Sequence, residues 1–436
     1  MRKRGGLLVK SKYSQINIKK RSVFEWLLLF VLLFPFFQAL LFELIKLPDV
    51  IKFLSDAFLV VTVFGLLIRK RIEINKYLLP ILIIVLVFFS YTLVVYFFNY
   101  QSVFYYLWGL RNIFRFFVAF IGFALWIDAD DAKRCLDFFD ILYFVNFFVV
   151  LIQFFGGFYQ DYLGGIFGTS KGCNGTLLLF LIIVVSKAIL SFMRKEGSIL
   201  KGSFIVISSL LIAALAEIKV FFLLFVLIVI ISSVMTKHSV RKTVLLIIGA
   251  FAILVFGTLL AALYETFSDF LSFDKIWALI TNPNYSTDED IGRITAIPTI
   301  SERFLPTLWN KLFGLGLGNC DSSSLAIFNT SFYSAYQHVH YTYFTYAMTY
   351  LETGIVGLVL YAAFFVAVLV KSINMYKNNL ADQLFCQLTV ILAVSCIILF
   401  VYNSSLKMDA SYFAYFGLAL PFISLRDKES SQQISV

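Results

Sequence analysis

Twelve long apolar runs constrain the fold of this chain more than any other feature of its sequence. Most of them approach the roughly 17 to 25 residues that a helix needs to cross the hydrocarbon core of a membrane. The chain is 60% hydrophobic and only 14% charged, and a water-soluble core cannot bury that much apolar surface. We therefore predict an all-α polytopic membrane protein with about twelve transmembrane helices. The runs are residues 24–45, 50–68, 77–98, 112–127, 138–156, 174–192, 203–217, 219–235, 243–264, 353–370, 384–402 and 408–425.

The distribution of Lys and Arg predicts how these helices are oriented. Cytoplasmic loops of membrane proteins carry an excess of these two residues. With the N-terminus inside, 25 of the 36 Lys and Arg fall in cytoplasmic segments and 11 fall outside. Twelve spans then place both termini in the cytoplasm. Because the net charge of +10 arises mainly in these loops, we do not expect nucleic acid as a partner.

A long polar loop is expected to carry the chemistry. It is far longer than an ordinary connection, and the stretch 290–357, which begins in the loop and ends in the next span, holds two of the three histidines. We interpret its acidic cluster, Asp288, Glu289 and Asp290, as the solvated face of a structured cap. The predicted segments are a cytoplasmic basic tail (1–23), transmembrane helices one to nine (24–264), the extracytoplasmic loop (265–352), transmembrane helices ten to twelve (353–425) and a cytoplasmic tail (426–436).

Five cationic side chains are candidates for binding an anion on the outer side. Arg293 follows a glycine and opens an amphipathic stretch that also carries Arg303; a guanidinium there could hold an oxyanion through two parallel hydrogen bonds, or simply pair with a nearby acid. Arg111 and Arg115 lie four residues apart at the start of the fourth predicted span, and Lys219 lies between the seventh and eighth spans. A charge at membrane depth costs about 2.5 to 3.5 kcal/mol and is usually paired or functional, although arginines can also snorkel to the interface. If these groups converge, they form a polycationic pocket suited to a lipid-linked pyrophosphate.

The two histidines of the loop are candidates for proton transfer. The unperturbed pKa of imidazole suits a base near neutrality, yet a lone interfacial histidine is more often structural. His338 and His340 have no evident third ligand nearby, so we expect no metal and no cofactor. The glycine-rich segment FGLGLGN (313–319) could approach a phosphate closely, but a tight turn is its more common meaning. Cys173 and Cys320 both fall outside in this topology and could form a disulfide.

Five segments in sequence order resemble a known family. They are GGIFGTSKGCNGTLLLFLII (164–183), AEIKVFFLLF (216–225), GRITAIPTI (292–300), LWNKLFGLGLGN (308–319) and HYTYFTYAMTYLETGIVGLVLY (340–361). Their order and setting are similar to those of the bacterial O-antigen polymerase and ligase superfamily, GT-C-like membrane glycosyltransferases that act on undecaprenyl-pyrophosphate glycans. The family usually has Asn after its histidine, where this chain has Tyr341, and either histidine or Tyr343 could occupy the histidine position.

The resemblance implies a metal-independent, inverting glycosyl transfer at the extracytoplasmic face of the bacterial cytoplasmic (inner) membrane. It suggests His340 as the base, with His338 as substitute. It suggests Arg293 and Lys219 as pyrophosphate ligands, assisted by Arg111, Arg115 and Arg303.

The resemblance leaves three activities to compare. We favour the polymerase of lipid-linked oligosaccharide repeat units for O-antigen, capsule or other surface polysaccharide, with the lipid bilayer and a chain-length regulator as further partners. A ligase would transfer the same glycan to a terminal acceptor. A lipid-linked glycan transporter or flippase belongs to a different class, and many transporters are built from repeated halves, which this sequence does not display.

Overall fold

The computed structural model describes residues 22–68, 74–237, 290–323 and 325–434, together with scattered positions between 242 and 258. In these residues the chain forms helices, turns and loops, with no β-strand. The basic tail up to residue 21, His238, Asp288 and Glu289 lie outside the described residues, and the ninth predicted span is described only at isolated positions.

Eleven of the predicted apolar runs coincide with helices in the described part of the chain. Among the described residues, seven helical stretches are long and apolar enough to cross a membrane by length and composition, which indicates an all-α membrane protein. The helices are α1 (Val23–Leu33), α2 (Leu54–Ile68), α3 (Leu79–Phe98), α4 (Val103–Trp126), α5 (Ala129–Phe155), α6 (Cys173–Met193), α7 (Ile199–Leu215), α8 (Lys219–Met235), α14 (Thr345–Lys377), α15 (Gln383–Tyr402) and α16 (Ser411–Ile434). Three short helices, α11 (Ala296–Arg303), α12 (Leu308–Phe313) and α13 (Ser331–Tyr336), belong to the polar loop.

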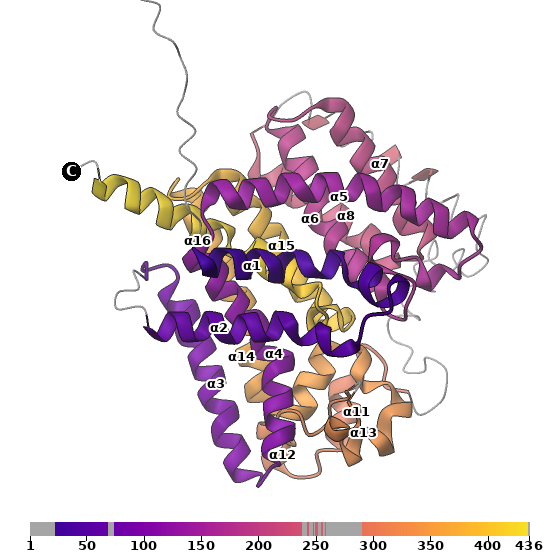
Figure 1. The fold of residues 1–436 in the computed structure, drawn as a ribbon, viewed down its shortest axis with the longest axis vertical. Coiled ribbons are helices and arrows are strands. Elements are labelled where there is room, and N and C mark those ends of the chain that lie inside the picture. Colours follow the sequence, from indigo (N-terminus) through magenta and orange to yellow (C-terminus); the bar gives the residue numbers. More distant parts are fainter. Residues whose placement is uncertain are drawn as a thin grey trace, which may run out of the picture.

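The centre of the bundle is formed by α4, α6, α15 and α16. Helix α16 packs against the other three, and Figure 1 shows it running out of their midst toward the C-terminus. Most of the apolar window of α6, α4 and α15 is buried, whereas only 22% is buried in α3 and in the stretch that ends with α2. The outward apolar side chains of α2 and α3 therefore present a surface suited to lipid.

Several helix bounds differ from the predicted runs. Helix α4 begins at Val103, nine residues before the predicted run, because aromatic residues continue its buried face toward the N-terminus. Arg111 and Arg115 therefore lie inside α4 and not at its start. Helix α16 continues to Ile434 through the predicted cytoplasmic tail, and its Arg426 donates hydrogen bonds to backbone carbonyls at the end of α4.

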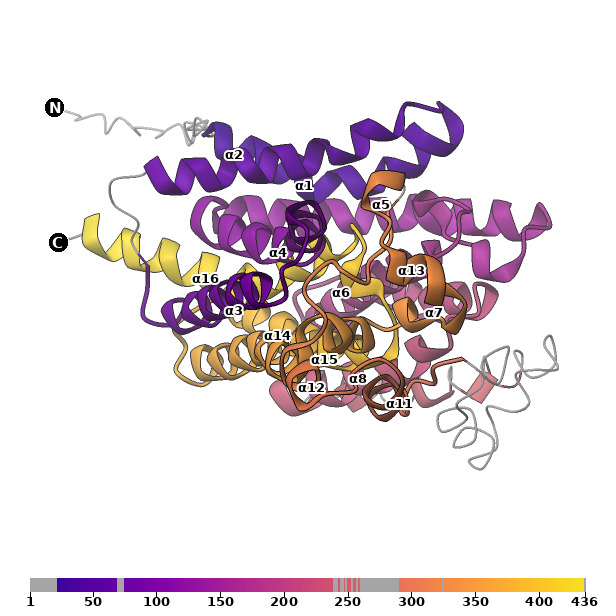
Figure 2. The same ribbon diagram turned by 90° about the horizontal axis from the view of Figure 1, so that it is seen from below.

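Five connecting segments meet at one end of the bundle. We call this the loop end and define it as residues 34–53, 99–102, 156–172, 290–344 and 403–410. Figures 1 and 2 show α11, α12 and α13 beside α14 in this region. Hydrogen bonds join these segments to each other and to the helices that end there. Examples are the bonds of Thr169 to Glu43, of Gln101 to the Leu317 carbonyl, of Lys171 to Tyr343 and of Thr345 to the Asn403 carbonyl.

Candidate functional site

A backbone seam between the glycine-rich turn and α14 organises the loop end. The amide of Leu315 donates to the carbonyl of Leu351 (3.0 Å), and that of Gly316 donates to Glu352 (2.9 Å). Helix α14 is interrupted at Gly354, whose φ of +62° favours glycine. A Cβ atom there would lie 2.3 Å from the Leu312 backbone, and one at Gly314 would lie 2.4 Å from the Glu352 backbone. The segment FGLGLGN is therefore a tight turn, as the more common meaning of its pattern predicts. The space beside its glycines is filled by other parts of the protein and not left for a phosphate.

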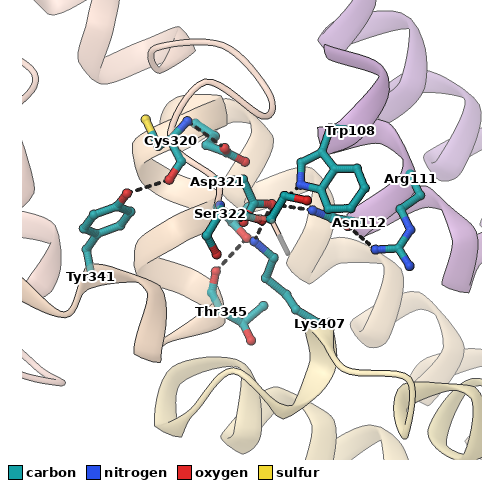
Figure 3. A network of polar contacts seen from close by, with 12 residues as sticks. Trp108, Arg111, Asn112, Cys320, Asp321, Ser322, Tyr341, Thr345 and Lys407 are labelled. Atoms are coloured by element: carbon teal, nitrogen blue, oxygen red, sulfur yellow. Dashed lines mark hydrogen bonds and ion pairs between the residues drawn. The ribbon is translucent and has the colours of Figure 1, made fainter. Parts of the chain in front are cut away.

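The carboxylate of Glu352 ties the next segment of the loop to this seam. Its Oε1 atom accepts a hydrogen bond from the Cys320 amide (3.1 Å), and the Tyr341 hydroxyl donates to the Cys320 carbonyl (2.6 Å). Figure 3 shows Tyr341 and Cys320 meeting beside this network. Burial raises the pKa of the Cys320 thiol well above its ordinary value. Cys320 and Cys173 are both free and buried, so the disulfide considered from sequence is not formed.

Arg111 and Arg115 converge, and they converge on carboxylates. An Nη atom of Arg111 lies 2.8 Å from Asp56, and an Nη atom of Arg115 lies 2.6 Å from Asp409 and 3.5 Å from Asp56. Although burial opposes ionisation, the Arg115 guanidinium holds the pKa of Asp409 below its ordinary value. The two arginines therefore belong to an ion-pair network. Such pairing is expected because an unpaired buried charge would be strongly destabilising.

A second part of this network reaches the polar loop. The side chain of Asn112 donates to Asp321 (2.7 Å), and the Lys407 ammonium lies 3.3 Å from the same carboxylate. Figure 3 shows Asn112 on α4 between Arg111 and Asp321, with Lys407 approaching from the α15–α16 connection. Arg111, Arg115 and Lys407 thus balance Asp56, Asp409 and Asp321. None of these acids was singled out from the sequence, because their partners lie on other helices.

His340 is held by a buried carboxylate. Its Nδ1 atom lies 2.8 Å from Oδ1 of Asp290, whose side chain is fully buried. His340 has a left-handed backbone with φ of +57°, and the Ile291 amide donates to the Val339 carbonyl beside it. The interpretation of Asp290 as part of a solvated acidic face is therefore wrong: the chain folds back at Val339 and covers its carboxylate.

Tyr343 contacts both His340 and a cation, Lys171. The rings of His340 and Tyr343 lie 4.6 Å apart, and the Lys171 ammonium donates to the Tyr343 hydroxyl (3.1 Å). Lys171 was not among the predicted site residues. The signal that could have drawn attention to it is its position between two loop glycines, Gly168 and Gly172, both with positive φ.

Arg293 lies close to the same part of the chain, beside Phe344. Its guanidinium stacks over Tyr402 (4.5 Å) and Phe344 (5.7 Å), and Nε donates to the Tyr402 carbonyl. Phe344 directly follows Tyr343, and Arg293 is three residues beyond Asp290. The structure therefore brings Arg293 and His340 onto neighbouring segments.

The end of α15 and the α15–α16 connection (residues 403–410) link these groups. The carbonyl of Tyr402, the last residue of α15, accepts from Arg293, and the Lys407 carbonyl accepts from Arg115 (3.3 Å). A Cβ atom on Gly172, next to Lys171, would lie 3.0 Å from Met408. Residues 402–410 thus contact Arg115 of α4, Arg293 of the polar loop and the loop that carries Lys171.

The remaining predicted site residues occupy other positions. His338 is exposed two residues before His340, and Arg303 is exposed in the last turn of α11. Lys219 is half-buried at the first residue of α8, after the left-handed Glu217. Within the described residues, no three His, Cys, Asp or Glu side chains are grouped as metal ligands.

No protein-family model matches the sequence, and no significant match is found among curated proteins. The function must therefore be argued from the residues of this chain.

Proposed function

We propose that the protein polymerises undecaprenyl-pyrophosphate-linked oligosaccharide repeat units by metal-independent, inverting glycosyl transfer. The observation that carries the proposal is the contact between His340 and the buried Asp290, with Arg293 on the neighbouring segment. A carboxylate on one imidazole nitrogen orients the ring and favours proton uptake at the other nitrogen. The family resemblance supplies the substrate class.

In the proposed reaction, Nε2 of His340 takes the proton of a sugar hydroxyl on the acceptor. The oxygen forms a bond to the anomeric carbon of the donor sugar from the face opposite the pyrophosphate. The bond between that carbon and the pyrophosphate oxygen breaks, and its electron pair leaves with the lipid pyrophosphate. A cation near the departing oxygen lowers the barrier by neutralising this charge, which is the role we assign to Arg293. Because Arg111 and Arg115 already pair with Asp56 and Asp409, we assign them to positioning the α15–α16 connection.

The proposal includes a membrane arrangement of twelve GT-C-like transmembrane helices. Both termini would lie in the cytoplasm and the loop end would face outward from a bacterial cytoplasmic membrane. The excess of Lys and Arg in the segments at the opposite end supports this orientation. A chain-length regulator would then meet the protein at its outer face or within the membrane.

The experiment that tests the proposal is reconstitution of the full chain in lipid nanodiscs with one defined undecaprenyl-pyrophosphate oligosaccharide. Products longer than one repeat, released undecaprenyl pyrophosphate and no need for a membrane gradient are the expected results. Transfer only to an added terminal acceptor would identify a ligase instead. Absence of any new glycosidic bond, with movement of the intact lipid across a vesicle membrane, would identify a transporter.

A further inference from the structure

The loop before α6 is built to hold Lys171 in place. Both backbone groups of Gly165 bond the Gln153 side chain at 2.8 and 2.9 Å. The Ile166 amide donates to the side chain of Asn146, and the Thr169 amide donates to the carboxylate of Glu43 (2.9 Å). These hydrogen bonds attach the loop to α5 and to the α1–α2 connection. The backbone that carries Lys171 therefore has little conformational freedom.

The ammonium of Lys171 differs from the charged groups of Arg111, Arg115 and Lys407. It is exposed, and none of the described carboxylates lies within ion-pair distance of it. Its neighbours are tyrosines: the hydrogen bond that it donates to the Tyr343 hydroxyl is the main reason that its pKa is raised, with smaller contributions from Tyr162 and Tyr333. Arg111, Arg115 and Lys407 each have an acid partner, whereas in the described part of the chain no carboxylate neutralises the positive charge of Lys171.

The position of this charge suggests which anion it meets. Lys171 and His340 both contact Tyr343, one at its hydroxyl and the other at its ring. We propose that Lys171 binds the diphosphate group of the lipid-linked donor, beside the histidine that takes the acceptor proton. The inference rests on the proposed function, because it uses the same donor. An ammonium makes short, charge-assisted hydrogen bonds to phosphate oxygens, and Tyr343 holds it in a fixed direction before the ligand arrives.

Direct binding to the full-length protein in nanodiscs tests the inference. The probe is farnesyl diphosphate, a short lipid diphosphate, and its affinity is measured by titration calorimetry. Lys171→Gln is expected to weaken binding about tenfold or more, as the loss of one charge-assisted contact predicts. Lys171→Arg is expected to bind within about threefold of the native protein, because the positive charge remains.

Lys52→Gln is the matched control. Lys52 also lies at the loop end, but its ammonium already pairs with Asp49 at 2.6 Å, so its loss is expected to leave the affinity unchanged. Equal affinities for the Lys171→Gln and Lys52→Gln proteins would overturn the inference. Equal melting temperatures of the two variants exclude misfolding as the cause of a difference.

Two further ligands separate the sources of the diphosphate. Farnesol, which lacks phosphate, should bind without regard to Lys171. Inorganic pyrophosphate should bind much more weakly than farnesyl diphosphate; if it binds as tightly and with the same dependence on Lys171, the site takes a soluble anion and the assignment to a lipid is wrong.

Different experimental results would contradict the proposed function and this inference. Normal diphosphate binding by Lys171→Gln, together with loss of polymer in His340→Ala, would leave the polymerase and remove the role of Lys171. Lysine-dependent binding of farnesyl diphosphate, together with full polymer synthesis by His340→Ala, would leave the diphosphate site and remove His340 as the base.

Discussion

The imidazole of His340 and the carboxylate of Asp290 meet at 2.8 Å, although fifty residues separate them in the sequence. The carboxylate is fully buried and 28% of the histidine side chain is exposed. One partner is therefore fixed within the protein while the other can reach a substrate. A buried acid that orients an exposed imidazole is the arrangement expected of a positioned general base.

Replacement of Asp290 by Asn should lower the rate of polymerisation more than it weakens substrate binding. The amide fills the same volume but cannot stabilise a protonated imidazole, so kcat should fall at least about 100-fold while KM changes little. Initial rates of the reconstituted protein at varied donor concentration measure both constants. Asp290→Glu should recover part of the rate because the charge returns.

Asp161→Asn is the control for this substitution. Asp161 is an exposed acid at the same end of the bundle, and its loss should leave both constants unchanged. A native kcat in Asp290→Asn protein would show that the Asp290–His340 contact has only a structural role.

Gly354→Ala should destabilise the protein more than Gly157→Ala does. Both glycines have positive φ, +62° and +79°, so both variants incur backbone strain of about 1 to 3 kcal/mol. A Cβ atom at Gly354 also collides with the Leu312 backbone at 2.3 Å, whereas nothing lies within 4 Å of one at Gly157. Melting temperatures of the two purified variants in one detergent compare the effects; equal losses would mean that the seam between α12 and α14 relaxes freely.

Asp409→Asn should reduce stability at neutral pH and lose this effect in acid. The pKa of Asp409 is lowered from 3.8 in the folded protein, so its ion pair contributes stability above about pH 4, and the contribution is lost as the pH falls through the folded-state pKa. Because the longer contact with Asp56 is then the acid contact that Arg115 retains, we expect a loss of about 3 kcal/mol at pH 7.

Melting curves of the native and Asp409→Asn proteins between pH 3 and 7 check this expectation. The difference between them should be largest near neutrality and shrink below pH 4. Asp49→Asn, which removes an exposed acid from an ion pair with Lys52, should show no such difference. A gap between native and Asp409→Asn protein that stays constant with pH would contradict the role of the charge.

Single cysteines should report opposite sides of the membrane at the two ends of the bundle. Ser170 lies in the loop before α6 and Ser198 precedes α7, and both are exposed. The five native cysteines are buried and give little background. In spheroplasts, a membrane-impermeant maleimide should label Ser170→Cys and spare Ser198→Cys until the membrane is opened; the reverse pattern would invert the proposed orientation.

The helices of this protein were predictable because the signal for a membrane helix is local. A backbone segment in lipid must satisfy its own hydrogen bonds, so length and apolar composition suffice to place α3 or α15 from the sequence. The early start of α4 and the long α16 were missed, since their additional turns are stabilised by contacts with distant segments, such as Arg426 with the end of α4.

The candidate site was predictable only as a list of residue types. The sequence by itself placed His340 and Arg293 in the polar loop and Arg111 and Arg115 on one helix, because spacing along the chain determines those facts. Only the tertiary structure decided that both α4 arginines pair with acids, that Asp290 is buried against His340 and that Lys171 reaches Tyr343. The interaction of two charges depends on their separation in space and on their burial, and for side chains 50 to about 300 residues apart both quantities arise only when the helices pack.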